Sequence, residues 1–325
     1  MNKYSVFNLD NDKSFEQKAL EVFQYQAKKN SIYRDFIKYL GIDPKAISNL
    51  IDIPFLPISF FKTHEVLSDN TKVEETFFSS GTTGGNLSKH RVTDLSIYKE
   101  SFSKGFQHFY GDIETFTILA LLPNYLEREG SSLVYMVDDL IRKTNKKESG
   151  FYLNNLDELS NKLISLDRKG EKIILIGVSF ALLDLIEYKS FNLKNTIIME
   201  TGGMKGRRKE IIRPALHELL KNGFGVSEIH SEYGMTELLS QAYSNGNGIF
   251  RTPSWMKILI RDTEDALTIF PHQKSGGINV IDLANINSCS FIATQDLGKT
   301  YKDGSFEILG RFDNSDIRGC NLMIV

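Results

Sequence analysis

The middle of the chain alternates short apolar runs with helix-like segments, and this pattern constrains the fold more than any other. The apolar run at 172–177 predicts a buried strand, and 196–199 and 227–231 predict two more. Helices are expected between them, at about 180–188 and about 207–221. Pro214 predicts a kink in the second helix. This alternation indicates an α/β domain with a largely parallel sheet flanked by helices.

The flanking segments extend this prediction. Further strands are expected at 74–78 and 117–122, and helices at 14–40, 94–110 and 133–142. Ser14 and Gln17 have capping-box spacing for the first of these helices, and Asp94 is an N-cap for the second. Residues 255–310 instead indicate short strands separated by turns. We therefore expect an α/β region over 1–250 and a smaller β-rich part over 251–325.

A loop rich in glycine and hydroxyl groups follows the strand that ends at Phe78. Its glycines let the backbone adopt positive φ angles and approach a ligand closely. Together with the hydroxyls, its N–H groups can surround one anion, most plausibly a phosphate. No Gly-Lys-Ser/Thr closes it, so it is not a Walker loop, and a flexible turn is the alternative. The residues concerned are Ser79, Ser80, Gly81, Thr82, Thr83 and Gly84, followed by Gly85.

Two other loops also come directly after predicted strands. Gly202 and Gly203 follow one strand, and Tyr233 and Gly234 follow another. Parallel strands place ligands beyond their carboxyl ends, so one cleft could collect all three loops. The Glu237 carboxylate, just after the turn, could bind Mg²⁺ on ATP phosphates or could stabilise a helix N-terminus.

Three ordered segments resemble the core motifs of the adenylate-forming enzymes, which make an acyl-adenylate from a carboxylate and ATP. They are the loop 79–85, the segment Ser-Glu-Tyr-Gly-Met-Thr-Glu at 231–237, and Ala-Thr-Gln-Asp-Leu-Gly at 293–298 with Gly-Arg-Phe-Asp at 310–313. The resemblance implies the fold of the N-terminal domain of that superfamily. It implies ATP and Mg²⁺ as cofactors.

Further segments look like the LuxE-type acyl-protein synthetase branch. These are Pro-Phe-Leu-Pro-Ile-Ser-Phe-Phe-Lys at 54–62, Leu-Leu-Pro-Asn-Tyr-Leu-Glu-Arg at 121–128, Gly-Ser-Ser-Leu-Val at 130–134, and Arg-Gly-Cys at 318–320. That branch transfers the acyl group onto a cysteine of its own, which the match places at Cys320. A fatty acid is its substrate, and a fatty-acid reductase or a carrier protein would accept the acyl group.

The resemblance also assigns roles to single residues. Thr236 should contact phosphate, Tyr233 should pack on adenine, and Glu237 matches the magnesium-binding glutamate. Asp296 matches the ribose-binding aspartate, although alone it would read as a turn residue. Arg311 matches an arginine near the nucleotide, although alone it would read as a surface ion pair of small energy.

The chain departs from the superfamily after the Gly-Arg-Phe-Asp segment. Most members continue there into a mobile domain that supplies a lysine to the adenylate, whereas this sequence stops at Val325. We expect that domain to be absent and a mobile tail with Cys320 to replace it. Lys62, Lys89 and Lys205 are unranked substitutes for the missing lysine.

The two cysteines predict different roles. Cys289 lies in an apolar segment and is typical of a buried small hydrophobe. Cys320 lies beside Arg318, and a nearby cation raises the thiolate fraction of a thiol.

Composition excludes several classes of protein. A net charge of −2 gives no reason to expect nucleic acid, and two cysteines suit a reducing compartment. We find no signal peptide and no apolar run that could span a membrane, so the cytoplasm is expected. An acid–thiol ligase that acylates coenzyme A or a carrier protein, and a non-catalytic nucleotide-binding assembly module, stay as alternatives to a self-acylating synthetase.

Overall fold

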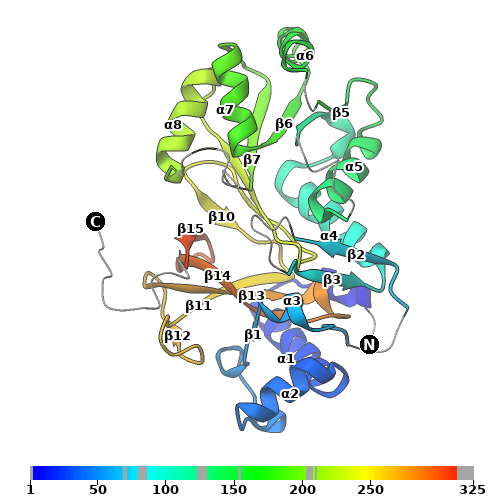
Figure 1. Cartoon of the computed structure of the whole chain (residues 1–325), viewed down its shortest axis with the longest axis vertical. Coiled ribbons are helices and arrows are strands. Elements are labelled where there is room, and N and C mark those ends of the chain that lie inside the picture. The colour runs from blue at the N-terminus through cyan, green and yellow to red at the C-terminus, as the bar shows by residue number, and fades with distance from the viewer. Residues whose placement is uncertain are drawn as a thin grey trace.

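The computed structural model describes residues 3–68, 72–79, 86–122, 130–152, 155–202, 208 and 211–312. Within them, a 13-stranded mixed sheet runs through the molecule, and a separate two-stranded sheet packs beside it (Figure 1). In spatial order the large sheet contains β12 (Ile269–Phe270), β11 (Met256–Arg261), β13 (Ser275–Asp282), β14 (Phe291–Thr300), β15 (Phe306–Arg311), β10 (Ile249–Arg251), β9 (Ala242–Ser244), β8 (His230–Tyr233), β7 (Thr196–Thr201), β6 (Ile173–Val178), β4 (Thr117–Leu121) and β5 (Gly150–Phe151), with β1 (Leu56–Pro57) paired to β14.

The sheet has a parallel half and an antiparallel half. Strands β5, β4, β6, β7 and β8 pair in parallel, as the strand–helix alternation predicts. From β8 onward, through β9 and β10 to β15, β14, β13, β11 and β12, successive strands pair antiparallel, and the short β1 adds a parallel pairing to β14. The predicted largely parallel sheet is therefore confirmed for one half, and the predicted β-rich segment forms most of the other. The boundary proposed at residue 250 lies inside β10, and the division into two parts stays a prediction.

Helices cover both faces of the parallel half (Figure 1). Helices α4 and α5 lie on one face, and α7 and α8 lie on the other. The buried strands β4 and β6 are apolar along their whole length because both faces are covered. The α-helices are α1 (Asp12–Lys29), α2 (Ser31–Tyr39), α3 (Phe60–Thr63), α4 (Leu95–Tyr110), α5 (Ser132–Thr144), α6 (Leu156–Arg168), α7 (Ser179–Tyr188) and α8 (Arg213–Phe224). Short 3₁₀ helices are η1 (Lys3–Phe7), η2 (Pro44–Ala46), η3 (Leu50–Asp52), η4 (Ile113–Thr115) and η5 (Leu283–Asn285).

The single helix predicted over 14–40 is wrong, because Asn30 divides it into α1 and α2. Its backbone N–H donates to the Gln26 carbonyl, which makes Asn30 the C-cap of α1. Its side chain accepts from the Tyr33 N–H, so Asn30 is also the N-cap of α2. The Asn30 amide also donates to the Ser288 carbonyl, which fixes the break against the sheet. The N-cap of α1 is Asn11, with Ser14 as the reciprocal partner, so the predicted Ser14–Gln17 capping box is wrong too.

The helix predicted from residue 207 begins at Arg213 instead. Residues 211 and 212 precede it without helical structure, and Pro214 lies in its first turn. A proline is tolerated there because first-turn N–H groups have no intrahelical partner. The predicted kink is therefore absent.

The strand predicted to end at Phe78 is confirmed as β2 (Glu75–Phe78), but it lies outside the large sheet. It pairs antiparallel with β3 (Lys89–Val92). This hairpin brings both ends of the glycine-rich loop to the side of the large sheet where β8 ends.

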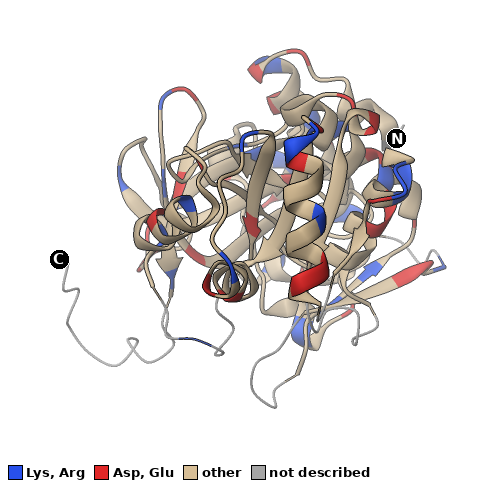
Figure 2. Ribbon diagram, turned by 90° about the horizontal axis from the view of Figure 1, so that it is seen from above, with Lys and Arg blue, Asp and Glu red and all other residues tan. Residues whose placement is uncertain are grey.

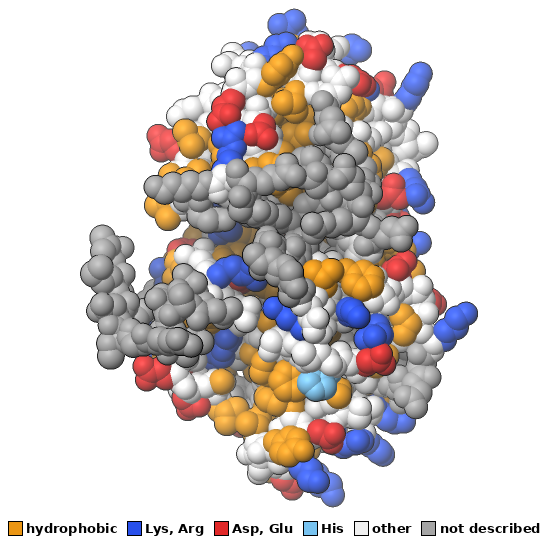
Figure 3. Space-filling model, in the orientation of Figure 1, with side chains coloured by type: hydrophobic (Ala, Val, Ile, Leu, Met, Phe, Trp, Pro, Cys, Tyr) orange, Lys and Arg blue, Asp and Glu red, His pale blue; other side chains and the backbone are white. Residues whose placement is uncertain are grey.

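The described surface has no face on which charges of a single sign gather. Basic and acidic residues are interspersed around the molecule (Figure 2). Hydrophobic side chains alternate with charged ones over the face seen in Figure 3. Among the described residues, none of the helices combines the length and apolarity needed to cross a membrane.

Candidate adenylation site

The carboxyl end of β8 meets the antiparallel half of the sheet at Asp296. The Tyr233 hydroxyl donates to Asp296 Oδ2 over 2.9 Å. Arg311, the register partner of Asp296 on β15, places its Nε 3.1 Å from Oδ1. The Tyr233 ring is fixed edge-on against Phe250 and Phe306. The structure thus brings together three residues that lie far apart in the sequence and were predicted to hold the nucleoside.

Burial determines the electrostatics of this group. The Asp296 side chain is only 8% exposed, whereas the Arg311 side chain is 75% exposed. Burial raises the pKa of Asp296, and the charge of Arg311 and the Tyr233 hydroxyl oppose that rise. Arg311 therefore forms more than an isolated surface ion pair, since its partner is a buried carboxylate.

The turn at Thr236 and Glu237 is held by two buried side chains. His90 Nδ1–H donates to the Thr236 carbonyl over 2.8 Å, and its Nε2 lies 3.0 Å from Asn285 Oδ1. The Asn285 amide nitrogen donates to the Glu237 carbonyl over 2.7 Å. Burial lowers the pKa of His90 to about 4, although both of its hydrogen bonds favour the charged ring. Sequence reasoning missed His90 and Asn285, and the only signal for His90 is its inward position on β3.

Glu237 places a buried carboxyl group beside this turn. It is 6% exposed, and burial raises its pKa. The Ser88 hydroxyl and the charges of Arg311 and Lys62 oppose that rise. No helix begins between Tyr233 and β9, a segment that the structure describes in full. The alternative role of Glu237 at a helix N-terminus is therefore wrong.

Both ends of the glycine-rich loop lie against the same turn. The Thr236 hydroxyl donates to the Phe78 carbonyl over 3.5 Å. The Ser79 N–H donates to the Ser88 carbonyl over 3.1 Å, and the Ser88 N–H donates to Ser79 Oγ over 3.0 Å. Ser80, Gly81, Thr82, Thr83 and Gly84, with Gly85, lie outside the described residues.

The third predicted loop begins at Gly202, beside β8. Gly202 has a φ of +67°, which favours glycine, and its carbonyl accepts from the Ser179 hydroxyl over 3.1 Å. One residue earlier, Thr201 pairs in register with Glu232 across β7 and β8. Gly203 lies outside the described residues. The described residues at the loop ends lie beside the carboxyl end of β8, and the convergence of the three loops on one site stays a prediction.

Position 234 requires a glycine because the Glu232 carboxyl group packs closely against its backbone. A Cβ atom there would lie 2.5 Å from Glu232 Oε1. Any larger residue would displace the carboxyl group or the turn that leads to Thr236.

The two cysteines lie in different parts of the chain. Cys289 is fully buried, burial raises its pKa to about 12, and its thiol donates to the Phe291 carbonyl. It is the inert core thiol that the sequence predicts. Cys320 lies outside the described residues. The chain leading toward it is fixed at Phe312, whose N–H donates to the Gln295 carbonyl and whose ring faces the Arg261 guanidinium at 5.4 Å.

Two of the three candidate lysines are described, and the charge of one of them, Lys62, reaches the site. It projects from α3, is exposed, and lowers the pKa of Glu237 through its charge. Lys89 is exposed on β3, and Lys205 lies outside the described residues.

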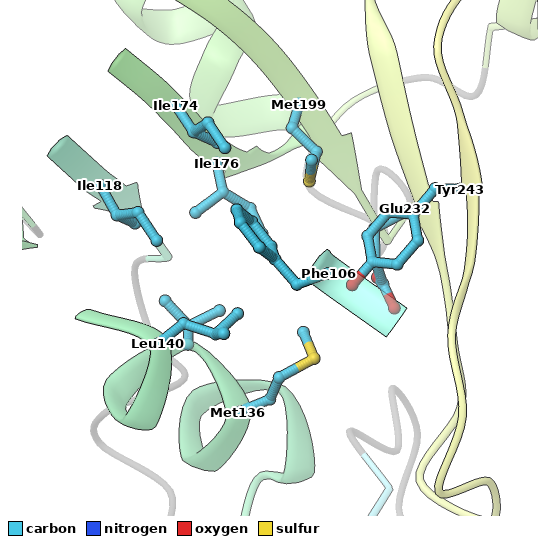
Figure 4. A pocket seen from close by; sticks show the side chains of 10 residues that line it. Phe106, Ile118, Met136, Leu140, Ile174, Ile176, Met199, Glu232 and Tyr243 are labelled. Atoms are coloured by element: carbon cyan, nitrogen blue, oxygen red, sulfur yellow. The ribbon is translucent and has the colours of Figure 1, made fainter. Parts of the chain in front are cut away.

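An apolar cavity adjoins the turn, between the parallel half of the sheet and helices α4 and α5 (Figure 4). Its unfilled space, open mouth included, is about 320 Å³. Polar groups enter it from Glu232, directly before Tyr233, and from Tyr243 on β9. The lining residues are Phe106, Ile118, Met136, Val137, Leu140, Ile174, Ile176, Met199, Glu232 and Tyr243.

The described residues include no group of three or more His, Cys, Asp or Glu side chains that could hold a metal by themselves. Mg²⁺ is commonly bound by one or two carboxylates together with substrate phosphates. Glu237 fits that mode of binding, because it provides a single buried carboxyl group next to Ser88, where the chain leaves the glycine-rich loop.

Comparison with known proteins agrees with this geometry. The family model described as "Acyl-protein synthetase, LuxE" matches residues 4–325. The chain is 24% identical over 322 residues to the "Long-chain-fatty-acid--luciferin-component ligase" of Vibrio harveyi, covering 92% of this chain and 84% of that protein.

Solved adenylate-forming enzymes share the fold. An open conformation of 2-hydroxyisobutyryl-CoA ligase with 2-HIB-AMP and CoA aligns with a TM-score of 0.67 at 13% identity, over 93% of this chain and 70% of that one. ATP-bound MatB from Rhodopseudomonas palustris aligns with a TM-score of 0.56 at 16% identity, over 76% of this chain. The match spans about half of the MatB chain, 49%. The predicted family and fold are confirmed: the chain belongs to the LuxE family of acyl-protein synthetases, which are ligases.

Proposed function

We propose that this ligase activates a carboxylic acid with ATP to form an acyl-adenylate and then carries the acyl group as a thioester on Cys320. One observation carries the first half of the proposal. Tyr233 is hydrogen-bonded to Asp296, and a few residues further along the chain His90 and Asn285 hold the backbone of Thr236 and Glu237, beside an apolar cavity.

The nucleoside would lie over Tyr233 and Asp296. The Tyr233 ring cannot turn freely between Phe250 and Phe306, so it offers adenine a fixed face. Asp296 accepts from Tyr233 and Arg311 and has further lone pairs for the ribose hydroxyls. Hydrogen bonds to an ionised carboxylate are stronger than neutral ones, so this contact would contribute much of the ATP affinity.

Adenylation is an in-line displacement at the α-phosphorus. A carboxylate oxygen of the acid attacks, the new P–O bond forms, and the bond to pyrophosphate breaks. The donors of 79–85, the Thr236 hydroxyl and the cations Lys62 and Arg311 are the groups of this chain that would stabilise the developing charge. Mg²⁺, held by Glu237, would neutralise charge on the ATP phosphates.

Thioester formation follows on the same cleft. The Cys320 thiolate, its proton lost to solvent, attacks the acyl carbonyl carbon, and AMP leaves with the electrons of the acyl–phosphate bond. Phe312 is anchored next to Asp296 and Arg311, and Cys320 is eight residues further along the chain. Eight extended residues reach up to about 26–29 Å, enough to return to the adenylate.

The apolar cavity is the proposed place for the acyl chain. The name of the Vibrio harveyi relative supports a fatty acid as the substrate class. Delivery of the acyl group to a partner, such as a fatty-acid reductase or a carrier protein, completes the proposal. A reducing compartment such as the cytoplasm would keep Cys320 as a free thiol.

Acid-dependent ATP–pyrophosphate exchange tests the adenylation step. The full chain with Mg²⁺ and radiolabelled pyrophosphate should form labelled ATP with some acids of a panel of varied chain length. Lys62→Met should lower the rate, because it removes a charge that reaches Glu237. Lys28→Met, at an exposed position on α1, is the matched control and should not. Exchange with no acid of the panel would refute adenylation.

A further inference from the structure

A buried carboxyl group that takes no part in the proposed chemistry holds the segment directly after Glu237. Asp282 is fully buried at the end of β13. Its Oδ2 accepts from the Leu239 N–H over 2.8 Å and from the Ser240 N–H over 3.0 Å. Its Oδ1 accepts from the Ser240 hydroxyl over 2.6 Å. One side chain thus binds three donors that lie two and three residues beyond the proposed Mg²⁺ ligand.

The segment has no regular structure that would fix it without Asp282. Residues 234–241 contain neither helix nor strand. The N–H groups of Leu239 and Ser240 belong to buried residues, and buried N–H groups are nearly always paired. Here a side chain 43 residues from Leu239 supplies the pairing. The conformation of the turn therefore depends on Asp282 more than on its own sequence.

The 3₁₀ helix that Asp282 begins also holds Glu237 itself. Asp282 is the N-cap of η5, and its Oδ1 accepts from the Ala284 N–H over 3.1 Å. Asn285, at the other end of η5, donates to the Glu237 carbonyl over 2.7 Å. Backbone groups of 237, 239 and 240 are thus all bonded to residues 282–285. The Glu237 carboxyl group takes no part in these bonds, so it stays available to a ligand.

We infer that Asp282 is a positioning residue of the adenylation site, which orients the turn so that the Glu237 carboxylate can bind Mg²⁺ on ATP. Mg²⁺ demands nearly ideal octahedral geometry, so a small displacement of a ligand lowers its affinity. Partners that orient a metal ligand typically contribute 10- to 100-fold in metal affinity or activity. The inference rests on the proposed role of Glu237 and adds a residue that does not touch the substrate.

A second carboxyl group of the same kind lies far from the site and separates positioning from plain stability. Asp167 is 6% exposed. It accepts from the Lys194 N–H over 3.0 Å, the Asn195 N–H over 2.8 Å and the Thr196 hydroxyl over 2.8 Å. These donors lie at the amino end of β7, whereas the site lies at the carboxyl end of the neighbouring β8. Replacing Asp167 removes a comparable set of bonds and none that hold Glu237.

Calorimetric binding of α,β-methylene-ATP to the full chain tests the inference without catalysis, because this analogue cannot release pyrophosphate. The ratio of the Kd with EDTA to the Kd with Mg²⁺ measures the gain from the metal. Asp282→Asn should lower this gain about tenfold and leave the Kd without metal nearly unchanged. Asp282→Ala should lower it further, because the amide keeps one acceptor oxygen and the methyl group none.

The matched variant is Asp167→Asn. It should lower the urea midpoint, as Asp282→Asn also does, but it should keep the wild-type gain from Mg²⁺. A loss of folded protein reduces the number of binding sites and does not change the ratio of the two Kd values. Asp282→Asn preserves the size of the side chain, so it decides the matter if Asp282→Ala does not fold.

The outcomes separate this inference from the proposed function. A wild-type gain in folded Asp282→Asn, or an equal loss of gain in Asp167→Asn, would overturn the inference and leave adenylation standing. A wild type that binds the analogue equally well with and without Mg²⁺ would overturn the inference together with the role of Glu237. Acid-dependent pyrophosphate exchange by that same protein would then show that adenylation itself survives, and its absence would overturn adenylation too.

Discussion

His90 gives a prediction that couples the adenylation turn to the stability of the fold. Its Nδ1–H donates to the Thr236 carbonyl and its Nε2 lies beside Asn285, whose amide nitrogen donates to the Glu237 carbonyl. We replace His90 with Gln, which keeps one donor but cannot titrate. At neutral pH the variant should lose about 1–3 kcal/mol of unfolding free energy, because the flexible amide does not reproduce the buried Nδ1–H bond to the Thr236 carbonyl.

The sharper part of the prediction is the pH dependence. Burial lowers the pKa of His90 from 6.5 to about 4 in the folded protein. Between these values the unfolded chain binds a proton that the folded protein does not, so acid destabilises the fold. Between about pH 7.5 and about pH 5, this proton linkage should lower the unfolding free energy of the wild type by about 2 kcal/mol. The His90→Gln variant should not show this loss.

Urea unfolding at the two pH values, for wild type and variant, measures this difference. The comparison with His90→Gln is needed because the titration of Glu232 changes the unfolding free energy in the opposite direction. Its pKa is raised to about 7, so its contribution becomes more favourable as the pH falls from 7 toward 4.5. His108→Gln, at an exposed position on α4, is the matched control. If the variant loses as much stability in acid as the wild type, or more, the ring holds a proton at neutral pH and its hydrogen bonds outweigh burial.

Further substitutions test the nucleotide site and the core. Glu237→Gln should lower acid-dependent exchange at least about 100-fold with the fold intact, because it removes the carboxylate charge, while Glu218→Gln on exposed α8 surface should not. Exchange at the wild-type rate would remove Glu237 from the site. Asp296→Ala should raise the KM for ATP about 10- to 100-fold, as expected for one charge-assisted hydrogen bond, and an unchanged KM would contradict the ribose contact. Cys289→Ser should cost about 1–3 kcal/mol in urea unfolding, because a hydroxyl enters an apolar core, and no loss would contradict the assigned burial.

The sequence predicts well what depends on local patterns. Strands β4 and β6 lie where apolar runs predict them, because a strand covered on both faces is largely apolar. Strand β7 begins as predicted but continues two residues further, through Glu200 and Thr201. Asp94 caps α4 as expected, since a side chain that accepts from nearby N–H groups acts locally.

Errors arise where a tertiary contact decides a local feature. Asn30 ends α1 because its amide bonds to Ser288, which lies more than 250 residues away. His90 and Asn285 lie 195 residues apart, and the pair carries no local signature.

The central claim is that the acyl group ends on Cys320. The direct measurement is incubation of the full chain with ATP, Mg²⁺ and a radiolabelled acid that supports exchange, with no external thiol, followed by denaturation and hydroxylamine treatment. Wild type and Cys289→Ser should accumulate a hydroxylamine-labile label. Cys320→Ser should not, because an unactivated hydroxyl is hardly ionised at neutral pH, yet it should still exchange pyrophosphate. Wild-type thioester labelling of Cys320→Ser, or label that forms only when coenzyme A or a carrier protein is added, would contradict self-acylation.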